Sequence, residues 1–523
     1  MDRSTDVIVL GAGHNGLTAA CYLARAGLDV LVVEAQDIVG GMTVTTSPIQ
    51  AAPGHRINEG SLDASLFRAS SISADLELPR YGLQEMEIDP SYVILDHEGG
   101  SLCLWRDPRK TASELEKYSR KDAASFLELA RVFDAAMDFL VPMMLTNPTR
   151  PAARNVAQAL KVLAKARRIP ALTRLLTASQ TEFIDDYFES PLVRGALVAL
   201  NPLSYTQWDG TGWHNIYFGF IHRFGISRFI GGTGNLSASL HRCLEASGGR
   251  VRTGAPVEKL LVQGGKVTGV RLIGGEELTA KAVVTSCNPK TTLTRLLPEG
   301  VLSEPLAKRA KHIPIDITKG ITIKVNAAFS GRLELPRHQA RRDDGVDLTK
   351  PLSIWHTLEQ YEQAWDACLA GELPDPIPYL CAVPSSFDPS QAPDGQDTFW
   401  GWSGVSPGHP KEPWEKLADR AADQMLKDAA QYYTGIDELE IGRQVLTGPR
   451  IEERFWAQEG NIFHVDPVLL RHGPLRPAQG FGGYRTPVPG LYLSGAGTHP
   501  TAGICGIPGQ LAAREVLKRV KAG

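Results

Sequence analysis

The first 34 residues follow a strand, helix and strand pattern that restricts the fold strongly. The segment VIVL at residues 7–10 is short, apolar and β-branched, which predicts a buried parallel strand. The segment LTAACYLARAG at 17–27 predicts a helix that ends at its glycine, and VLVV at 30–33 predicts a second strand. Together these segments indicate a βαβ unit, and hence an α/β fold with a parallel sheet.

Glycines occupy the turn between the first predicted strand and the helix. Gly11, Gly13 and Gly16 have G-x-G-x-x-G spacing, and Glu34 ends the second strand. In a βαβ unit such glycines allow the backbone to approach a pyrophosphate, and the helix N-terminus attracts its charge. A carboxylate at position 34 can accept hydrogen bonds from an adenosine ribose. Because strand, helix and acid accompany the glycines, the pattern predicts a bound dinucleotide rather than a glycine-rich turn without a ligand.

Two features narrow the choice of dinucleotide. Glu34 disfavours NADP, because its carboxylate and a 2′-phosphate would place two anions at one site. Gly40 and Gly41 follow closely, and a glycine pair there lets a second backbone segment lie against a pyrophosphate or ribityl chain, as in FAD. An ordinary loop is the alternative interpretation of this pair.

The C-terminal segment 490–520 predicts a strand, a glycine-rich turn and a terminal helix from about Pro508. The N-terminus of such a helix can stabilise negative charge on the pyrimidine end of a flavin. A buried strand–turn–helix, with its glycines used for packing, is the alternative. The glycines of this segment are Gly495, Gly497, Gly503, Gly506 and Gly509.

Segments from the whole chain resemble a known family. The N-terminal glycine motif, residues 231–272 and LYLSGAGTHP near the C-terminus are similar to phytoene-dehydrogenase-like FAD-dependent oxidoreductases. Residues 384–395 and 452–464 resemble one branch, which includes pyridine nucleotide-disulfide oxidoreductase domain-containing protein 2. The resemblance implies a Rossmann-like FAD-binding domain of the glutathione-reductase-2 and amine-oxidase type, interleaved with a substrate domain.

The resemblance also implies where FAD lies. Its adenosine would lie near the first glycine turn and Val257, and its flavin ring near the Met42 segment and the C-terminal glycines. Met42 replaces the arginine of many relatives, Ala496 replaces an acid of amine oxidases, and Thr501 and Ala502 interrupt a glycine run. The implied cofactor-binding residues are Gly11, Gly13, His14, Asn15, Gly16, Glu34, Ala35, Gly40, Gly41, Met42, Thr43, Gly60, Ser61, Val257, Gly495, Ala496, Gly506 and Ile507.

We expect the two domains to alternate along the chain. The FAD-binding domain is predicted to comprise 1–72, 228–325 and 450–523, and the substrate domain 73–227 and 326–449. Within the first, residues 251–286 alternate short β-branched runs with Gly-Gly turns, which predicts an antiparallel meander whose last strand rejoins the parallel sheet.

Composition excludes several classes of partner and chemistry. The 55 basic and 58 acidic residues nearly balance, so nothing indicates nucleic acid binding. The 7 cysteines are scattered, without a C-x-x-C pair or a metal-ligand spacing, which fits buried thiols in a reducing compartment. Covalent flavin attachment through Cys505 or His499 is a minor alternative to a packed thiol and a hydrogen-bonded imidazole.

We expect a cytoplasmic protein, because the first predicted strand begins too early for a signal peptide and no apolar run reaches transmembrane length. Residues 154–176 temper this expectation, since they combine an apolar stripe with basic residues. Such a helix either contacts a membrane peripherally or packs on the core with a basic outer face.

The segment 200–225 is the most aromatic of the chain, and we expect it either to line the substrate pocket or to form a large core under a sheet. His499, in the loop before the terminal helix, is the leading candidate for a polar group near the flavin. Its alternative role is to anchor that turn. Tyr205 and His222 are secondary candidates. No zinc site, nucleophile triad or paired-carboxylate site is evident.

These features predict an FAD-dependent dehydrogenase or desaturase that forms a C=C bond in an apolar isoprenoid or alicyclic molecule. Because a single dinucleotide motif is visible, we expect electrons to pass to oxygen, a quinone or another carrier. The alternatives are a flavin-dependent amine oxidase, a flavin-dependent isomerase without net redox change, and a non-catalytic prenyl-type binding protein. The intact glycine motif and Glu34 disfavour the last.

Overall fold

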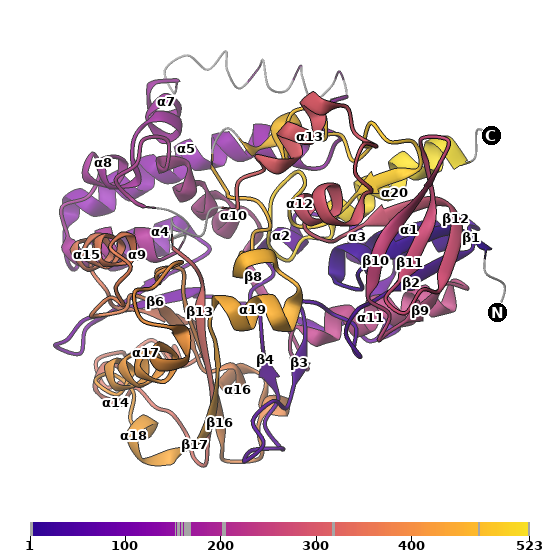
Figure 1. Cartoon of the computed structure of the whole chain (residues 1–523). Coiled ribbons are helices and arrows are strands. Elements are labelled where there is room, and N and C mark those ends of the chain that lie inside the picture. The colour runs from indigo at the N-terminus through magenta and orange to yellow at the C-terminus, as the bar shows by residue number, and fades with distance from the viewer. Residues whose placement is uncertain are drawn as a thin grey trace.

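The computed structural model describes residues 4–151, 153, 157, 161, 169–200, 205–315, 320–468 and 471–520. Two β-sheets lie beside each other, and helices pack around both (Figure 1). The described chain begins in the first sheet and ends in a helix packed on it, so both ends lie in the same part of the molecule.

The first sheet contains the predicted βαβ unit. Strand β1 pairs in parallel with β2 on one side and with β12 on the other, where Leu10 lies opposite Thr285. Strands β10, β11 and β12 form the predicted antiparallel meander. The predicted α/β fold is thereby confirmed. The sheet order is β10 (Val257–Gln263), β11 (Lys266–Leu272), β12 (Glu277–Thr285), β1 (Ser4–Leu10), β2 (Val30–Val33) and β9 (Arg250–Arg252), with β18 (Leu491–Leu493) also parallel to β12.

Helix α1 (His14–Arg25) lies between α11 (Gly234–Ala246) and α20 (Ile507–Val520). Its apolar residues are largely buried, as the pattern of the sequence predicts for a crossover helix. The contact with α20 requires a glycine, because a Cβ at Gly509 would lie 2.1 Å from the carbonyl oxygen of Asn15. This close packing fixes the start of α20 beside the first glycine turn.

The second sheet separates two environments. On one face, Val325 and Phe399 pack with Met425 of helix α17 (Trp414–Ala429) in a hydrophobic core. The other face of its β13–β16–β17 end borders the first sheet and carries the residues of the candidate site. The sheet order is β17 (Glu440–Leu446), β13 (Ile323–Phe329), β16 (Asp397–Ser403), β15 (Leu380–Ala382), β14 (Leu352–Ile354), β6 (Tyr92–Leu95) and β7 (Ser101–Leu104).

Two predicted domain boundaries fall inside strands. Strand β13 begins two residues before the predicted boundary at 325 and belongs wholly to the second sheet. Strand β8 (Ile226–Phe229), which the boundary at 228 divides, pairs with β5 (Glu85–Ile88). A change of domain within a strand leaves no mark in local composition, so these boundaries depend on strand pairing.

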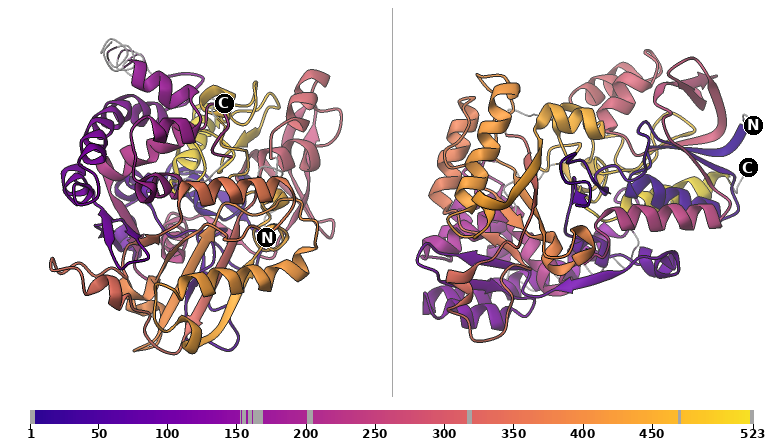
Figure 2. Two further views of the ribbon diagram at one scale, coloured as in Figure 1. Left: turned by 90° about the vertical axis from the view of Figure 1, so that its left-hand side faces the viewer. Right: turned by 90° about the horizontal axis from the view of Figure 1, so that it is seen from below.

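The remaining elements surround the two sheets (Figure 2). None of the described helices has both the length and the apolarity of a membrane span. The remaining helices are α2 (Ser65–Arg68), α3 (Ile72–Asp75), α4 (Pro108–Leu115), α5 (Arg120–Met144), α7 (Ile169–Thr177), α8 (Gln180–Asp185), α9 (Pro191–Ala199), α10 (Tyr217–Phe224), α12 (Pro289–Thr291), α13 (Glu304–Lys311), α14 (Pro336–Gln339), α15 (Leu358–Leu369), α16 (Pro384–Phe387), α18 (Ile436–Leu439) and α19 (Gly448–Phe455), and the remaining strands are β3 (Thr45–Thr46) and β4 (Ile57–Asn58).

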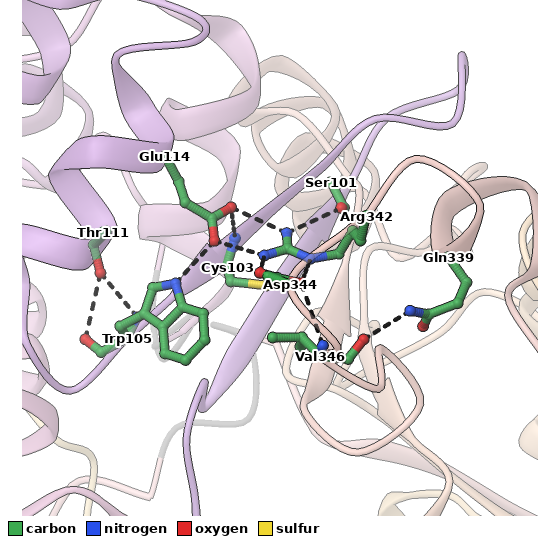
Figure 3. Close-up of polar contacts among 9 residues, drawn as sticks. All are labelled: Ser101, Cys103, Trp105, Thr111, Glu114, Gln339, Arg342, Asp344 and Val346. Atoms are coloured by element: carbon green, nitrogen blue, oxygen red, sulfur yellow. Dashed lines mark hydrogen bonds and ion pairs between the residues drawn. The ribbon is translucent and has the colours of Figure 1, made fainter.

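A buried ion pair joins the edge of the second sheet to the loop after α14 (Figure 3). Arg342 donates to both carboxylate oxygens of Glu114, at 2.8 and 3.1 Å, and the backbone N–H of Cys103 and the indole N–H of Trp105 donate to the same carboxylate. Burial by itself would raise the pKa of Glu114, but the hydrogen bonds from Arg342, Cys103 and Trp105 outweigh it and lower that pKa. The ionised carboxylate therefore anchors the loop.

We expect Glu114→Ala to lower the free energy of unfolding by about 3 kcal/mol, because it leaves the Arg342 guanidinium buried without its partner. Glu77→Ala is the matched control, since Glu77 pairs with Arg25 and Arg80 at the surface and such pairs contribute at most about 1 kcal/mol. Denaturant unfolding followed by tryptophan fluorescence measures both. Equal effects of the two substitutions would show that the buried pair is dispensable.

Candidate functional site

A cavity of about 420 Å³ lies between the two sheets. Its lining combines the first glycine turn, the loop after β2, the segment from Gly41 to Val44, and the ends of β13, β16 and β17. Ile38 and Trp456 line the cavity and are also 41% and 57% exposed, so they mark its opening to solvent.

The first glycine turn is closed so tightly that side chains cannot replace its hydrogens. A Cβ at Gly16 would lie 2.0 Å from the carbonyl oxygen of Gly11, and Gly11 itself has a φ of +90°. Gly13 forms a parallel bridge with Gly40, and a Cβ at Gly41 would lie 3.3 Å from the Cα of Gly13. The two glycine segments therefore lie backbone against backbone at the start of α1.

Glu34 holds the other side of this cradle. Its carboxylate accepts hydrogen bonds from the backbone N–H groups of Ala12, at 2.7 Å, and Gln36, at 2.9 Å. It lines the cavity with Ala35 and Val257, next to the end of β2. A carboxylate fixed in this way has further lone pairs for ribose hydroxyls, and its charge disfavours a 2′-phosphate.

The C-terminal loop closes the cradle from the side of α20. The Nε2 atom of His14 lies 3.2 Å from the carbonyl oxygen of Gly503, which ties the first turn of α1 to this loop. Burial lowers the pKa of His14 to about 4, so the imidazole is neutral at physiological pH. Ala496 and Ala502 line the cavity beside it. The loop thus presents backbone and small neutral side chains to the site.

Most of the cofactor residues implied by the sequence lie in the cavity wall. Those outside the wall support it from behind: Gly16 and Gly40 close the glycine turns, and Ile507 begins α20 behind Gly506. The members of the wall are Gly11, Gly13, His14, Asn15, Glu34, Ala35, Gly41, Met42, Thr43, Gly60, Ser61, Val257 and Ala496; Gly495 lies outside it, packed against Ser286.

Met42 has a structural explanation for replacing an arginine. Its side chain packs against Leu446 and Ile451 of the second sheet and α19, while its carbonyl oxygen accepts hydrogen bonds from the N–H and hydroxyl groups of Ser61. An apolar side chain suits the place where this segment passes α19.

The second sheet contributes a group of residues that the sequence analysis did not identify. Lys324 on β13 lies opposite Trp402 on β16 and Leu446 on β17. Because side chains alternate along a strand, Trp400 and Trp402 share one face, and both line the cavity with Lys324. The alternation in DTFWGWS could have placed the two tryptophans on one face, but not at this cavity.

Glu59 and Arg454 form an ion pair at the same end. Arg454 donates two hydrogen bonds to the buried carboxylate, at 2.7 and 3.0 Å, and Gln444 and Thr46 donate to it as well. Burial would raise the pKa of Glu59, but the bonds from Arg454 and Gln444 outweigh it and lower that pKa. This carboxylate is therefore ionised and fully engaged.

The predicted catalytic candidates do not line the cavity. The Nε2 atom of His499 lies 3.1 Å from the carbonyl oxygen of Met143, and burial lowers the pKa of its imidazole to about 4. His222 lies between α5 and α10, with Nδ1 near the carbonyl oxygen of Arg106. Tyr205 donates to Asp366 near the surface. Their contacts assign all three to the packing of the helical region, which sequence proximity to the glycine loop did not reveal.

Three further sequence expectations have structural outcomes. Of the aromatic segment 200–225, the described residues 205–225 pack into the main core and none lines the cavity. Cys505 is buried, and its pKa is raised to about 12 by burial, so its thiol is protonated. The basic stretch 154–176 lies largely outside the described residues, and α7 covers its end. Among the described residues, no cluster of possible metal ligands occurs.

Comparisons with known proteins agree with this architecture. The family described as flavin-containing amine oxidoreductases matches residues 16–517. The chain is 30% identical to pyridine nucleotide-disulfide oxidoreductase domain-containing protein 2 of Rattus norvegicus, over 99% of this chain and 94% of that protein. It is 25% identical to a limonene dehydrogenase polypeptide of Castellaniella defragrans, over 95% of this chain and 92% of the relative.

More distant matches share the fold. Phytoene desaturase (neurosporene-forming) of Cereibacter sphaeroides is 24% identical, over 98% of this chain and 94% of that protein. A solved structure of a putrescine oxidase triple mutant superposes with a TM-score of 0.65 at 16% identity, covering 99% of each chain. The predicted family resemblance and FAD as cofactor are thereby confirmed.

We expect Gly13→Val and Glu34→Arg each to yield protein without FAD. A Cβ at Gly13 meets no protein atom closer than 3.9 Å, so the valine would fit the fold but project into the cradle, while arginine would remove the ribose acceptor. Absorbance near the flavin bands, relative to protein content, measures the bound FAD. Glu258→Arg on the exposed side of β10 is the control and should retain it. Stoichiometric FAD in both cradle variants would contradict the site.

Proposed function

Because this chain belongs to the flavin-containing amine oxidoreductase family, and is an FAD-dependent oxidoreductase, we propose that it dehydrogenates an apolar isoprenoid or alicyclic molecule and forms a C=C bond. The observation that carries this proposal is the wall of the cavity beyond the FAD cradle. That wall is aromatic and aliphatic, and its members are Trp400, Trp402, Leu446, Ile451 and Phe455.

The charges of the cavity favour this substrate class over amines. The carboxylates in its wall are those of Glu34, which is bound to two backbone N–H groups, and Glu59, which is bound to Arg454. Neither is available to a substrate ammonium. Lys324 and Arg454 would repel such a group when charged. An amine oxidase, the second candidate, is supported by the family and by the fold of putrescine oxidase.

The curated relatives support the same class. Limonene is alicyclic and phytoene is an isoprenoid, and proteins named for their dehydrogenation or desaturation match nearly the whole of this chain. We extend this chemistry to the present protein as a proposal, because identities near 25% leave room for a change of substrate.

When bound, FAD supplies the two-electron acceptor that takes a hydride from the substrate carbon. The residues of this chain would bind and orient the substrate. Trp400 and Trp402 offer flat apolar faces at one wall, and Leu446, Ile451 and Phe455 complete the apolar lining. Such a wall excludes water and favours molecules without charge near the reacting carbon.

The route by which electrons leave is also a proposal. The described part of the first sheet contains one glycine cradle with an acid at the next strand, which we assign to FAD. We propose that reduced FAD passes its electrons to oxygen, a quinone or another carrier. Oxygen consumption, compared with reduction of a soluble quinone, distinguishes these acceptors.

Anaerobic bleaching of the flavin absorbance tests the substrate class. We expect a cyclic monoterpene such as limonene, or a longer isoprenoid in detergent, to bleach the flavin, and benzylamine and putrescine to leave it oxidised. Bleaching by the amines alone would support the amine oxidase. Product formation from the alkene with a flavin that stays oxidised at steady state would instead indicate an isomerase.

We expect Trp402→Ala to raise KM for the bleaching substrate about tenfold or more while FAD content stays stoichiometric, because the substitution removes an apolar wall outside the glycine cradle. Trp208→Ala, away from the cavity wall, is the matched control. Steady-state kinetics and flavin absorbance measure both properties. An unchanged KM would place the substrate elsewhere.

A further inference from the structure

Lys324 is a buried amine for which the described residues supply no anionic partner. Its side chain is 3% exposed, and its Nζ atom donates to the carbonyl oxygen of Asn58, at 2.6 Å, and to the side-chain oxygen of Asn326. Among the described residues, no carboxylate forms an ion pair with it. The Nζ atom also lies 4.9 Å from the centroid of the Trp400 ring.

This arrangement is incomplete by the usual rules for buried charge. A lysine ammonium has three N–H donors, and the two hydrogen bonds to neutral oxygens leave the third for another acceptor. Buried cations are ordinarily paired with an anion, because removing them from water is costly. Lys324 faces a cavity, so a ligand can reach it.

The neighbouring carboxylate cannot supply the missing charge. Glu59 is engaged by Arg454, Gln444 and Thr46. Burial holds the pKa of Lys324 well below the usual range, although the attraction of Glu59 acts to raise it. With Glu59 and Arg454 cancelling, this end of the cavity is neutral when Lys324 is deprotonated and positive when it is protonated. A bound anion would stabilise the protonated form.

We infer that the substrate carries a carboxylate, which binds Lys324 while its apolar body lies against Trp400, Trp402 and Leu446. This inference rests on the proposed function and narrows it, from an apolar molecule to an apolar acid. The register of the sheet supports it, because Trp402 and Leu446 flank Lys324 on the neighbouring strands. A ligand seated on this face would therefore meet one cation among apolar side chains.

Three probes of similar shape test the inference on the FAD-loaded protein: cyclohexanecarboxylate, cyclohexanemethanol and cyclohexanemethylamine. Titration followed by the flavin difference spectrum and by calorimetry gives their affinities at one pH. We expect the carboxylate to bind at least tenfold more tightly than the alcohol, and the amine to bind most weakly. Equal affinities, or preference for the amine, would overturn the inference without any variant.

Variants assign the preference to Lys324. We expect Lys324→Met to reduce the affinity for the carboxylate to that for the alcohol, Lys324→Arg to preserve the preference in part, and Lys308→Met on exposed α13 to leave it unchanged. If Lys324→Met shifts the midpoint potential of the flavin but keeps the carboxylate preference, the partner of Lys324 is the cofactor and the inference is wrong.

The same preparations separate this inference from the proposed function. Loss of FAD, or absence of bleaching by any alkene, would count against the dehydrogenase itself. Bleaching by neutral alkenes with no preference for their carboxylate derivatives would leave the dehydrogenase intact and refute the role of Lys324.

Discussion

The close approach of backbone at the first glycine turn is the constraint on which the rest of the site depends. The hydrogen atoms of Gly11 and Gly16 allow β1 to pass into α1 with a contact that no side chain could fit. That contact brings the N-terminus of α1 against Gly40 and Gly41, and Gly509 brings α20 against the same helix. One packing arrangement thus assembles three segments, far apart in sequence, around the FAD cradle.

A second constraint connects this cradle to the second sheet. The segment from Met42 to Ser61 leaves the cradle, forms β3 and β4, and returns to the cavity. Along the way Asn58 accepts a hydrogen bond from Lys324, and Glu59 binds Arg454 and Gln444. Because these bonds are buried, they fix the distance between the cofactor cradle and the substrate wall. The two sheets therefore act as one site, although their strands alternate along the chain.

The parts of the site that sequence analysis could predict are those whose chemistry is local. The glycine spacing, the strand before it and Glu34 after it lie within one βαβ unit, so their relative positions follow from the unit itself. Residues chosen by proximity to a motif were less well placed. His499 follows shortly after β18, yet its imidazole bonds to Met143 at the end of α5. Tyr205 and His222 likewise belong to helix packing, because nothing in an aromatic segment specifies which face meets a cavity.

The sequence by itself determined the α/β fold, the cofactor cradle at Gly11 to Glu34 and the identity of FAD, since short-range backbone geometry imposes them. The tertiary structure alone decided which residues face the substrate. Lys324, Trp402 and Leu446 come from three strands far apart in the sequence, and they meet because β16 and β17 pair with β13 in one register. Strand pairing is a long-range choice made by the packing of the whole sheet, so no local pattern reveals it.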